Sequence, residues 1–308
     1  MPRFDKIAAS LVAAFAVLMT FVAHAQAGDL LVSSRFSNNI LRYTSTGAFV
    51  GVFASCNNPN GIVYGPDGNL YVALGDEPRI LKLDGQTGAL ISEFVNPSTP
   101  GGLASPRAIA FGPDGNLYVC SGASDQVLAY SGATGAFLRV AASGQGLDGP
   151  VGLTFGPEGN LYVGGALSNR AYAFAPDGTF LRSFACPSGA SHLGMVIDKQ
   201  GRLLVARSGS NIVLAYDPGT GGCLGVVAQG NGLSLPIYLT LEADGNLLVG
   251  SFNNSAVLRF DPVSTQFLGV VVPSSAGGLS GTHTVVHMPD APVPARPEHW
   301  GTLKVRYR

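Results

Sequence analysis

Short apolar runs of four to six residues alternate with polar, glycine-containing turns along most of the chain. In one stretch, apolar runs at 62–64, 70–73, 79–83 and 90–94 flank turns that contain Asp67-Gly68 and Thr87-Gly88. Turns of the Asp-Gly and Thr-Gly kind between such runs are typical of β-hairpins. The runs are apolar at successive positions, as in strands that are buried on both faces. The pattern predicts units of four short strands, and no helical periodicity follows residue 28.

One phrase repeats through the chain. Gly-Pro-Asp-Gly-Asn-Leu-Tyr-Val occurs at 65–72 and at 112–119, and weaker copies end at Val163, Val205 and Val249. The chain also carries Gly-Asp-Leu-Leu-Val at 28–32. The glycines that mark the phrase are 40 to 47 residues apart: Gly28, Gly68, Gly115, Gly159, Gly201 and Gly245. Four strands in a period of about 40–45 residues are the spacing of a propeller blade. The sequence therefore predicts an all-β, six-bladed β-propeller.

The first unit lacks its opening strand, and a matching segment lies at the other end of the repeats. Residues 283–290 (His-Thr-Val-Val-His-Met-Pro-Asp) align position for position with residues 60–67 (Asn-Gly-Ile-Val-Tyr-Gly-Pro-Asp). We expect the last strand to complete the first blade, which closes the ring and removes free sheet edges. The alternative, unrelated hairpins in a sandwich, does not account for the split unit.

The first 25 residues have the layout of a secretory signal peptide. Arg3 and Lys6 precede an uncharged run at 7–22, and Ala23-His24-Ala25 offers a cleavage site. The alternative is an uncleaved anchor, but a spanning helix needs about 20 apolar residues. We expect residues 1–25 to be removed, residues 26–290 to form the propeller in a secreted or periplasmic protein, and residues 291–308 to form a proline-rich, then basic tail. The tail is either disordered or a docking or sorting segment.

Composition narrows the function classes further. The net charge of −1 gives no basic footprint for nucleic acid. No other segment is long and apolar enough to span a membrane. We expect the protein to be a monomer.

Export permits disulfides, but spacing does not settle the pairing of Cys56, Cys120, Cys186 and Cys223. The repeated Asp-Gly-Asn resembles part of a calcium loop; without a trailing bidentate Glu, it is interpreted as a turn. We predict no metal site and no cofactor.

The first strand of each blade lines the channel of a propeller, so the residue that enters it should face the channel mouth. These aligned positions hold Asn60, Arg107, Val151, Leu193, Ile237 and His283. Asn60, Arg107 and His283 form a polar arc, and His192 and Arg207 of the fifth blade approach from across the channel. The loops between second and third strands open on the same face and carry Arg35, Phe36, Asp76, Glu77, Asp125, Asn169, Arg207, Asn211 and Phe252. We predict that Asn60, Arg107, His192, Arg207 and His283 bind a ligand, with Arg107 and His283 as donors to anionic groups. The alternative is that these residues only hydrate the channel.

The repeat resembles the NHL repeat, with a Gly-Ile or Gly-Leu strand, then Asp-Gly-Asn-Leu-Tyr-Val and a Val-Leu-x-Tyr/Phe strand, over roughly residues 28–290. The chain is distantly similar to gluconolactonase-type and streptogramin B lyase propellers. That resemblance implies a divalent cation held by Glu, Asn and Asp, or by His and Glu, but only Asn60 and His283 are of suitable type here. We therefore expect a binding module for a small polar ligand or an extracellular protein. The alternatives are a cation-dependent lyase or lactone hydrolase that uses Asn60 and His283, and a purely structural scaffold.

Overall fold

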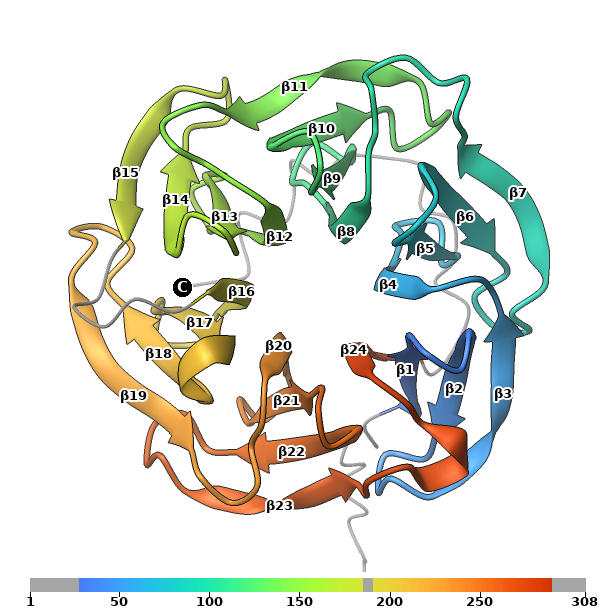
Figure 1. Ribbon diagram of the computed structural model, residues 1–308, viewed down its shortest axis with the longest axis vertical. Coiled ribbons are helices and arrows are strands. Elements are labelled where there is room, and N and C mark those ends of the chain that lie inside the picture. Colours follow the sequence, from blue (N-terminus) through green and yellow to red (C-terminus); the bar gives the residue numbers. More distant parts are fainter. Residues whose placement is uncertain (1–27, 185–190, 290–308) are drawn as a thin grey trace, which may run out of the picture.

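The computed structural model describes residues 28–184 and 191–289. Within these residues, six four-stranded antiparallel sheets surround a central channel (Figure 1). Each sheet is one blade, and its innermost strand lies next to the channel. The predicted six-bladed β-propeller is confirmed.

In each blade the four strands lie side by side from the channel outward. Blade 1 consists, in that order, of β24 (Thr282–His287), β1 (Leu30–Ser34), β2 (Asn39–Tyr43) and β3 (Phe49–Ser55). Blade 2 consists of β4 (Pro59–Tyr64), β5 (Leu70–Leu74), β6 (Arg79–Leu83) and β7 (Leu90–Val95). Blade 3 consists of β8 (Pro106–Phe111), β9 (Leu117–Ser121), β10 (Gln126–Tyr130) and β11 (Phe137–Ser143).

The remaining blades follow the same order. Blade 4 consists of β12 (Pro150–Phe155), β13 (Leu161–Gly165), β14 (Arg170–Phe174) and β15 (Phe180–Phe184). Blade 5 consists of β16 (His192–Ile197), β17 (Leu203–Arg207), β18 (Ile212–Tyr216) and β19 (Cys223–Gln229). Blade 6 consists of β20 (Pro236–Leu241), β21 (Leu247–Ser251), β22 (Ala256–Phe260) and β23 (Phe267–Val272). Two short 3₁₀ turns, η1 (Ser208–Ser210) and η2 (Ala276–Gly278), lie in loops.

Blade 1 is closed by strands from the two ends of the propeller, as the split repeat predicted. β24 pairs antiparallel with β1, with Leu30 opposite His287 and Val32 opposite Val285. In Figure 1 the red β24 lies beside the blue β1. The pairing gives the inner edge of β1 a hydrogen-bonding partner, so the ring has no gap at this point.

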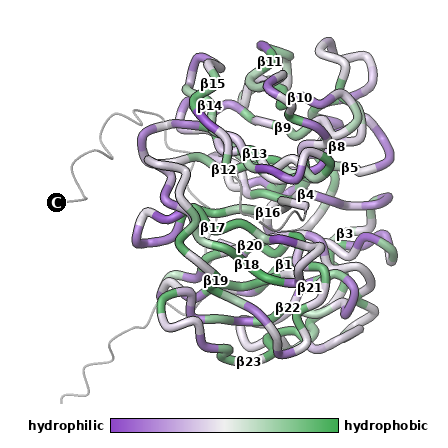
Figure 2. Tube along the Cα trace, turned by 60° about the vertical axis from the view of Figure 1, so that its left-hand side comes forward, coloured by the Kyte–Doolittle hydropathy of each residue, from purple (hydrophilic) through white to green (hydrophobic). Residues whose placement is uncertain are grey.

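The core consists of apolar layers between adjacent blades. Between blades 2 and 3, for example, Tyr71 and Ile80 pack with Ile109 and Val119 in one buried cluster. Hydrophobic residues follow the strands, whereas the loops are more hydrophilic (Figure 2). Each sheet therefore buries both faces, which is why its inner strands are apolar without alternation.

The Asp-Gly-Asn repeats form the turns between the first and second strands of the blades, on the face that we call the turn face. Asp67 accepts hydrogen bonds from the Asn69 backbone at 3.1 Å and from the Tyr71 hydroxyl at 3.0 Å. Asp114 does the same for Asn116 and Tyr118. Each carboxylate is thus used within its own hairpin, which agrees with the interpretation of the motif as a turn rather than a calcium loop.

Candidate functional site

The opposite face carries the loops between second and third strands, and we call the opening of the channel there the mouth. The inner-strand residues that were predicted to face the mouth are not equally accessible. Asn60 is fully buried and His283 is 5% exposed, whereas Arg107 is partly buried. Among the predicted ligand-binding residues with described side chains, Arg107 remains partly exposed to solvent, whereas Asn60, Arg207 and His283 are buried.

Asn60 joins the inner strands of three blades. Its side-chain nitrogen donates to the Pro106 carbonyl of blade 3 at 3.3 Å. Its own carbonyl accepts hydrogen bonds from the hydroxyls of Ser33 at 2.8 Å and Thr284 at 3.0 Å, both in blade 1. Because all of these groups are buried, Asn60 holds β24, β4 and β8 together at the channel. The next residue, Gly61, leaves room for this approach, since an added Cβ would lie 2.4 Å from the Arg107 carbonyl oxygen.

His283 lies beneath a region of positive potential. Burial, followed by the nearby Arg35 and Arg107 guanidinium groups, lowers the pKa of His283 to about 3. Its ring lies between Tyr238, at a centroid distance of 5.1 Å, and Phe252, at 6.5 Å. The imidazole is therefore neutral at physiological pH and adds no positive charge to the mouth, although it keeps one N–H donor.

Arg35 and Arg107 supply the positive charge of the mouth. Arg35 donates from Nε to the Asn58 side-chain oxygen at 2.8 Å. Burial and the charge of Arg35 both lower the pKa of Arg107, while Asp76 opposes them. Among the described residues, neither arginine forms a salt bridge with a carboxylate. Two like charges that lie close together without a paired anion form a site suited to an anionic group.

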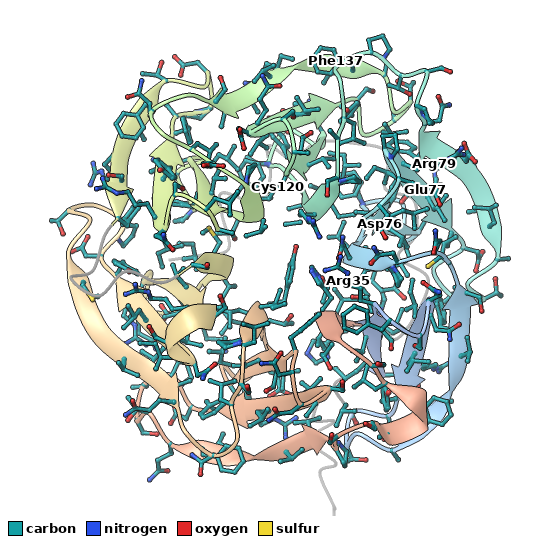
Figure 3. The ribbon with its side chains drawn as sticks, viewed as in Figure 1. Arg35, Asp76, Glu77, Arg79, Cys120 and Phe137 are labelled. Atoms are coloured by element: carbon teal, nitrogen blue, oxygen red, sulfur yellow. The ribbon has the colours of Figure 1, made fainter. Side chains whose placement is uncertain are left out.

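The loop contacts of blades 2 and 3 position Asp76 and Arg107 at one side of the mouth. The Ser105 hydroxyl donates to the Gly75 carbonyl at 3.1 Å and so ties the loop before β8 to the loop that carries Asp76. Asp76 is exposed, and Figure 3 shows it on the same side of the channel as Arg35. Gly122 flanks the stem of Arg107, where an added Cβ would lie 3.3 Å from Arg107 Cγ.

Tyr238 reaches across the channel. The equivalent inner-strand position holds only small residues in the other five blades: Gly61, Ala108, Gly152, Gly194 and Thr284. From β20 of blade 6, the Tyr238 ring packs against the buried cluster of blades 3 and 4, and its hydroxyl lies 3.5 Å from the Val151 carbonyl oxygen. Burial raises the pKa of Tyr238 well above its usual value, so the phenol stays protonated. The tyrosine forms a floor under the mouth. The sequence could have pointed to Tyr238, because it is the single large side chain at an aligned position that holds small residues in the other five repeats.

Arg207 does not lie in the open mouth. It is the last residue of β17 and is fully buried. Three other blades hold a serine at this position. The hydroxyls of Ser34, Ser121 and Ser251 accept from a backbone N–H of the loop that precedes the inner strand of their own blade. Arg207 therefore occupies a position that anchors loops in blades 1, 3 and 6, which the repeat alignment shows and the residue type does not.

His192 begins β16, and its backbone pairs with that of Arg207. Its side chain lies outside the described residues, as do Cys186 and the predicted signal peptide and tail. Cys56 and Cys120 are free thiols, and Cys223 is disulfide-bonded. Burial raises the pKa of the Cys56 thiol to about 12.

The described part of the chain holds neither a cluster of metal ligands nor a membrane-spanning helix. In the ranges 28–184 and 191–289, no three His, Cys, Asp or Glu side chains lie close enough together to hold a metal ion. Over the same ranges, none of the helices has the length and apolar character required to cross a membrane.

The architecture defines a six-bladed β-propeller, the fold expected from the resemblance to the NHL repeat. No family model matches the chain, and no curated protein matches it. Among solved structures, a chain of a nidogen/laminin complex is similar at 19% identity, with a TM-score of 0.72 and coverage of 85% of this chain and 98% of that one. A protein of unknown function from Bacteroides caccae is similar at 14% identity, with a TM-score of 0.67 and coverage of 85% and 99%. Virginiamycin B lyase from Staphylococcus aureus is similar at 17% identity, with a TM-score of 0.58 and 71% coverage of each chain. At these identities, the similarities establish the fold.

Proposed function

We propose that this protein is an exported binding module that holds an anionic ligand at the mouth of its channel. The ligand is a small polar molecule or an acidic segment of an extracellular protein. The observation that carries the proposal is the pair of arginines, Arg35 and Arg107, which have no salt-bridge partner among the described residues and which add to the effect of burial in lowering the pKa of His283.

The same potential argues against the alternative, a cation-dependent lyase or lactone hydrolase that uses Asn60 and His283. Burial and the two arginine charges, which together disfavour a proton on His283, also disfavour a divalent cation beside it. The fold is shared with a lyase, but function depends on the residues of the site rather than on the fold. The carboxylates of the turn face lie on the opposite side of the ring and are used within their own hairpins.

The test is calorimetric titration of the protein without residues 1–25, using succinate, inorganic phosphate and poly-L-glutamate as probes. We expect Arg107→Ala to weaken binding of these anions by about 1.5–3 kcal/mol, the usual contribution of a hydrogen bond to a charged group. The melting temperature should change little, because a partly exposed arginine without an ion pair contributes little packing. Higher salt should also weaken anion binding to the parent protein, because dissolved ions screen the attraction between the exposed arginines and the anion.

Arg170→Ala is the matched control. Arg170 begins β14 on the same face of the propeller, in blade 4, and is exposed, with no salt bridge among the described residues. Equal loss of binding in the two variants, or no anion binding at all, would contradict the proposal. A rise in melting temperature with Mg²⁺ or Ca²⁺ would instead favour the cation-dependent enzyme, because a ligand that binds only the folded state stabilises it.

A further inference from the structure

The mouth combines its two arginines with an aromatic surface that anion binding alone does not require. Phe36, directly after Arg35, is 63% exposed. Its ring packs edge-on against Phe252 at 5.4 Å, and the Arg35 guanidinium carbon lies 5.8 Å from its centroid. Gly281 leaves space for this pair, since an added Cβ would lie 2.7 Å from the Phe36 ring. An apolar ring held in this way beside a cation, and left largely open to solvent, offers a surface for a ligand.

The aromatic surface continues from the rim of the mouth down to its floor. Phe252 lies against His283, and His283 lies against Tyr238, the residue that crosses the channel. We call Phe36, Phe252 and Tyr238 the aromatic wall. They come from blades 1 and 6, whereas Arg107 and Asp76 come from blades 3 and 2. A ligand in the mouth therefore meets the apolar rings and Arg35 on one side, and Arg107 and Asp76 on the other.

Asp76 supplies a third kind of contact. Its carboxylate is exposed and close enough to Arg107 to oppose the lowering of the Arg107 pKa, yet it does not form a salt bridge among the described residues. An ionised carboxylate accepts hydrogen bonds and donates none. It would repel a ligand that is only anionic, and it would bind one that also carries hydroxyl groups.

We propose that the ligand of the mouth is an acidic sugar, such as a uronic acid unit of a polysaccharide. Its carboxylate would bind Arg35 and Arg107, its hydroxyl groups would donate to Asp76, and the C–H face of its ring would lie on Phe36. Tyr238 would limit how deeply the sugar enters. This inference rests on the proposed function and names the chemical class that combines an anion, hydroxyl donors and an apolar ring face. A simple dicarboxylate matches only the arginines, and a neutral sugar matches only Asp76 and the aromatic wall.

The experiment compares D-galacturonate and tri-galacturonate with galactose and succinate by calorimetric titration. We expect tri-galacturonate to bind at least tenfold more tightly than succinate, and galactose to bind more weakly than either. Phe36→Ser should weaken galacturonate binding about fivefold to tenfold, the contribution of one ring contact, and leave succinate binding unchanged. Asp76→Asn should weaken galacturonate binding but strengthen succinate binding, because a like charge is removed.

Leu167→Ser is the matched control, because Leu167 is a 70% exposed apolar residue in the equivalent loop of blade 4. We expect it to affect neither ligand. If succinate binds through Arg107 while galacturonate binds no more tightly and Phe36→Ser has no effect, the sugar inference is overturned and the binding module stands. If neither ligand shows Arg107-dependent binding, the proposed function itself fails.

Discussion

The two faces of the ring treat their charged groups differently. On the turn face, four acid–base pairs lie within blades: Asp29 with Arg42, Asp67 with Lys82, Asp198 with Arg202, and Glu242 with Arg259. Two further arginines of this face, Arg139 and Arg182, donate to backbone carbonyls of the next blade. On the mouth face, the outer rim pairs Arg79 with Glu77 and Glu93. The arginines nearest the channel, Arg35 and Arg107, have no such partner in the described part of the chain.

This difference separates residues that maintain the propeller from residues that are available to a ligand. A charge that is paired inside its own blade stabilises that blade and has few hydrogen-bonding positions left. A charge without a pair contributes little to folding and lies beside a like charge at some energetic cost. Sites that bind ligands commonly keep such unfavourable arrangements, because the ligand relieves them.

The largest expected effect concerns ring closure, on which both faces depend. Deleting residues 281–308 removes β24 and leaves the inner edge of β1 unpaired. We expect aggregation or loss of the cooperative melting transition, because an exposed strand edge pairs with other chains. Circular dichroism melting and size-exclusion chromatography measure this directly. Deleting only residues 290–308 keeps β24 and is the control that should melt cooperatively. A 281–308 deletion that melts like the parent would remove the support for closure by β24.

Closure also shows how much of the molecule could be predicted from sequence. Each blade carries its own copy of the turn and of the strand after it, so the number of blades and the split first blade could be inferred from repetition alone. The turn role of the Asp-Gly-Asn repeats could be inferred in the same way, because every partner of Asp67 lies within the next few residues or on the neighbouring strand.

The site was less accessible to prediction because its members come from different blades. Arg35 lies near His283 only because residues 281–287 return to blade 1, and its effect on Arg107 depends on how blades 1 and 3 face the channel. For Arg207, residue type suggested a ligand contact, whereas the structure buries the side chain at the repeat position that holds loop-anchoring serines in three other blades. Burial, which neutralises His283, is a property of the assembled ring.

The second expected effect tests the turn face. The Asp198 carboxylate is fully buried and accepts from Arg202 Nε at 2.7 Å and from the backbone of Gln200 at 3.0 Å. Arg202 also donates to the Pro262 carbonyl of blade 6 at 3.0 Å. Asp198→Ala removes the acceptor of Arg202 Nε and of the Gln200 N–H and leaves the arginine charge without its carboxylate, so we expect the free energy of unfolding to fall by about 2–4 kcal/mol. Chemical denaturation measures the change.

Asp76→Ala is the comparison on the mouth face. Because Asp76 is exposed and has no salt bridge among the described residues, its removal should change the free energy of unfolding by less than about 0.5 kcal/mol. If Asp76→Ala destabilised the protein as much as Asp198→Ala, the distinction between the two faces would be lost.

The last expected effect depends on pH and concerns His283, which is buried in the fold and also contacts the residues of the mouth. Its pKa of about 3 in the folded protein is below the ordinary value of 6.5. Between these two values the unfolded chain binds a proton that the folded protein does not, so stability falls as the pH is lowered from 6.5 towards 3. The loss is about 1.4 kcal/mol per pH unit, or about 2 kcal/mol at pH 5. The charged and titratable groups around the ring are Arg35, Arg107 and Tyr238, and none of them changes charge in this range.

His283→Gln removes this titration while keeping a side-chain N–H donor. We expect the difference in unfolding free energy between pH 7 and pH 5 to be about 2 kcal/mol smaller in the variant than in the parent. All other carboxylates and histidines are common to both proteins, so their contribution cancels in the comparison. Denaturation curves at the two pH values measure it, whatever the stability of the variant at pH 7. An unchanged pH dependence would mean that His283 keeps its ordinary pKa of 6.5 in the folded protein. At pH 5 a histidine cation would then join Arg35 and Arg107 in the mouth. In that case anion binding should strengthen at pH 5 in the parent but not in His283→Gln, which makes the stability measurement a check on the charge of the site as well.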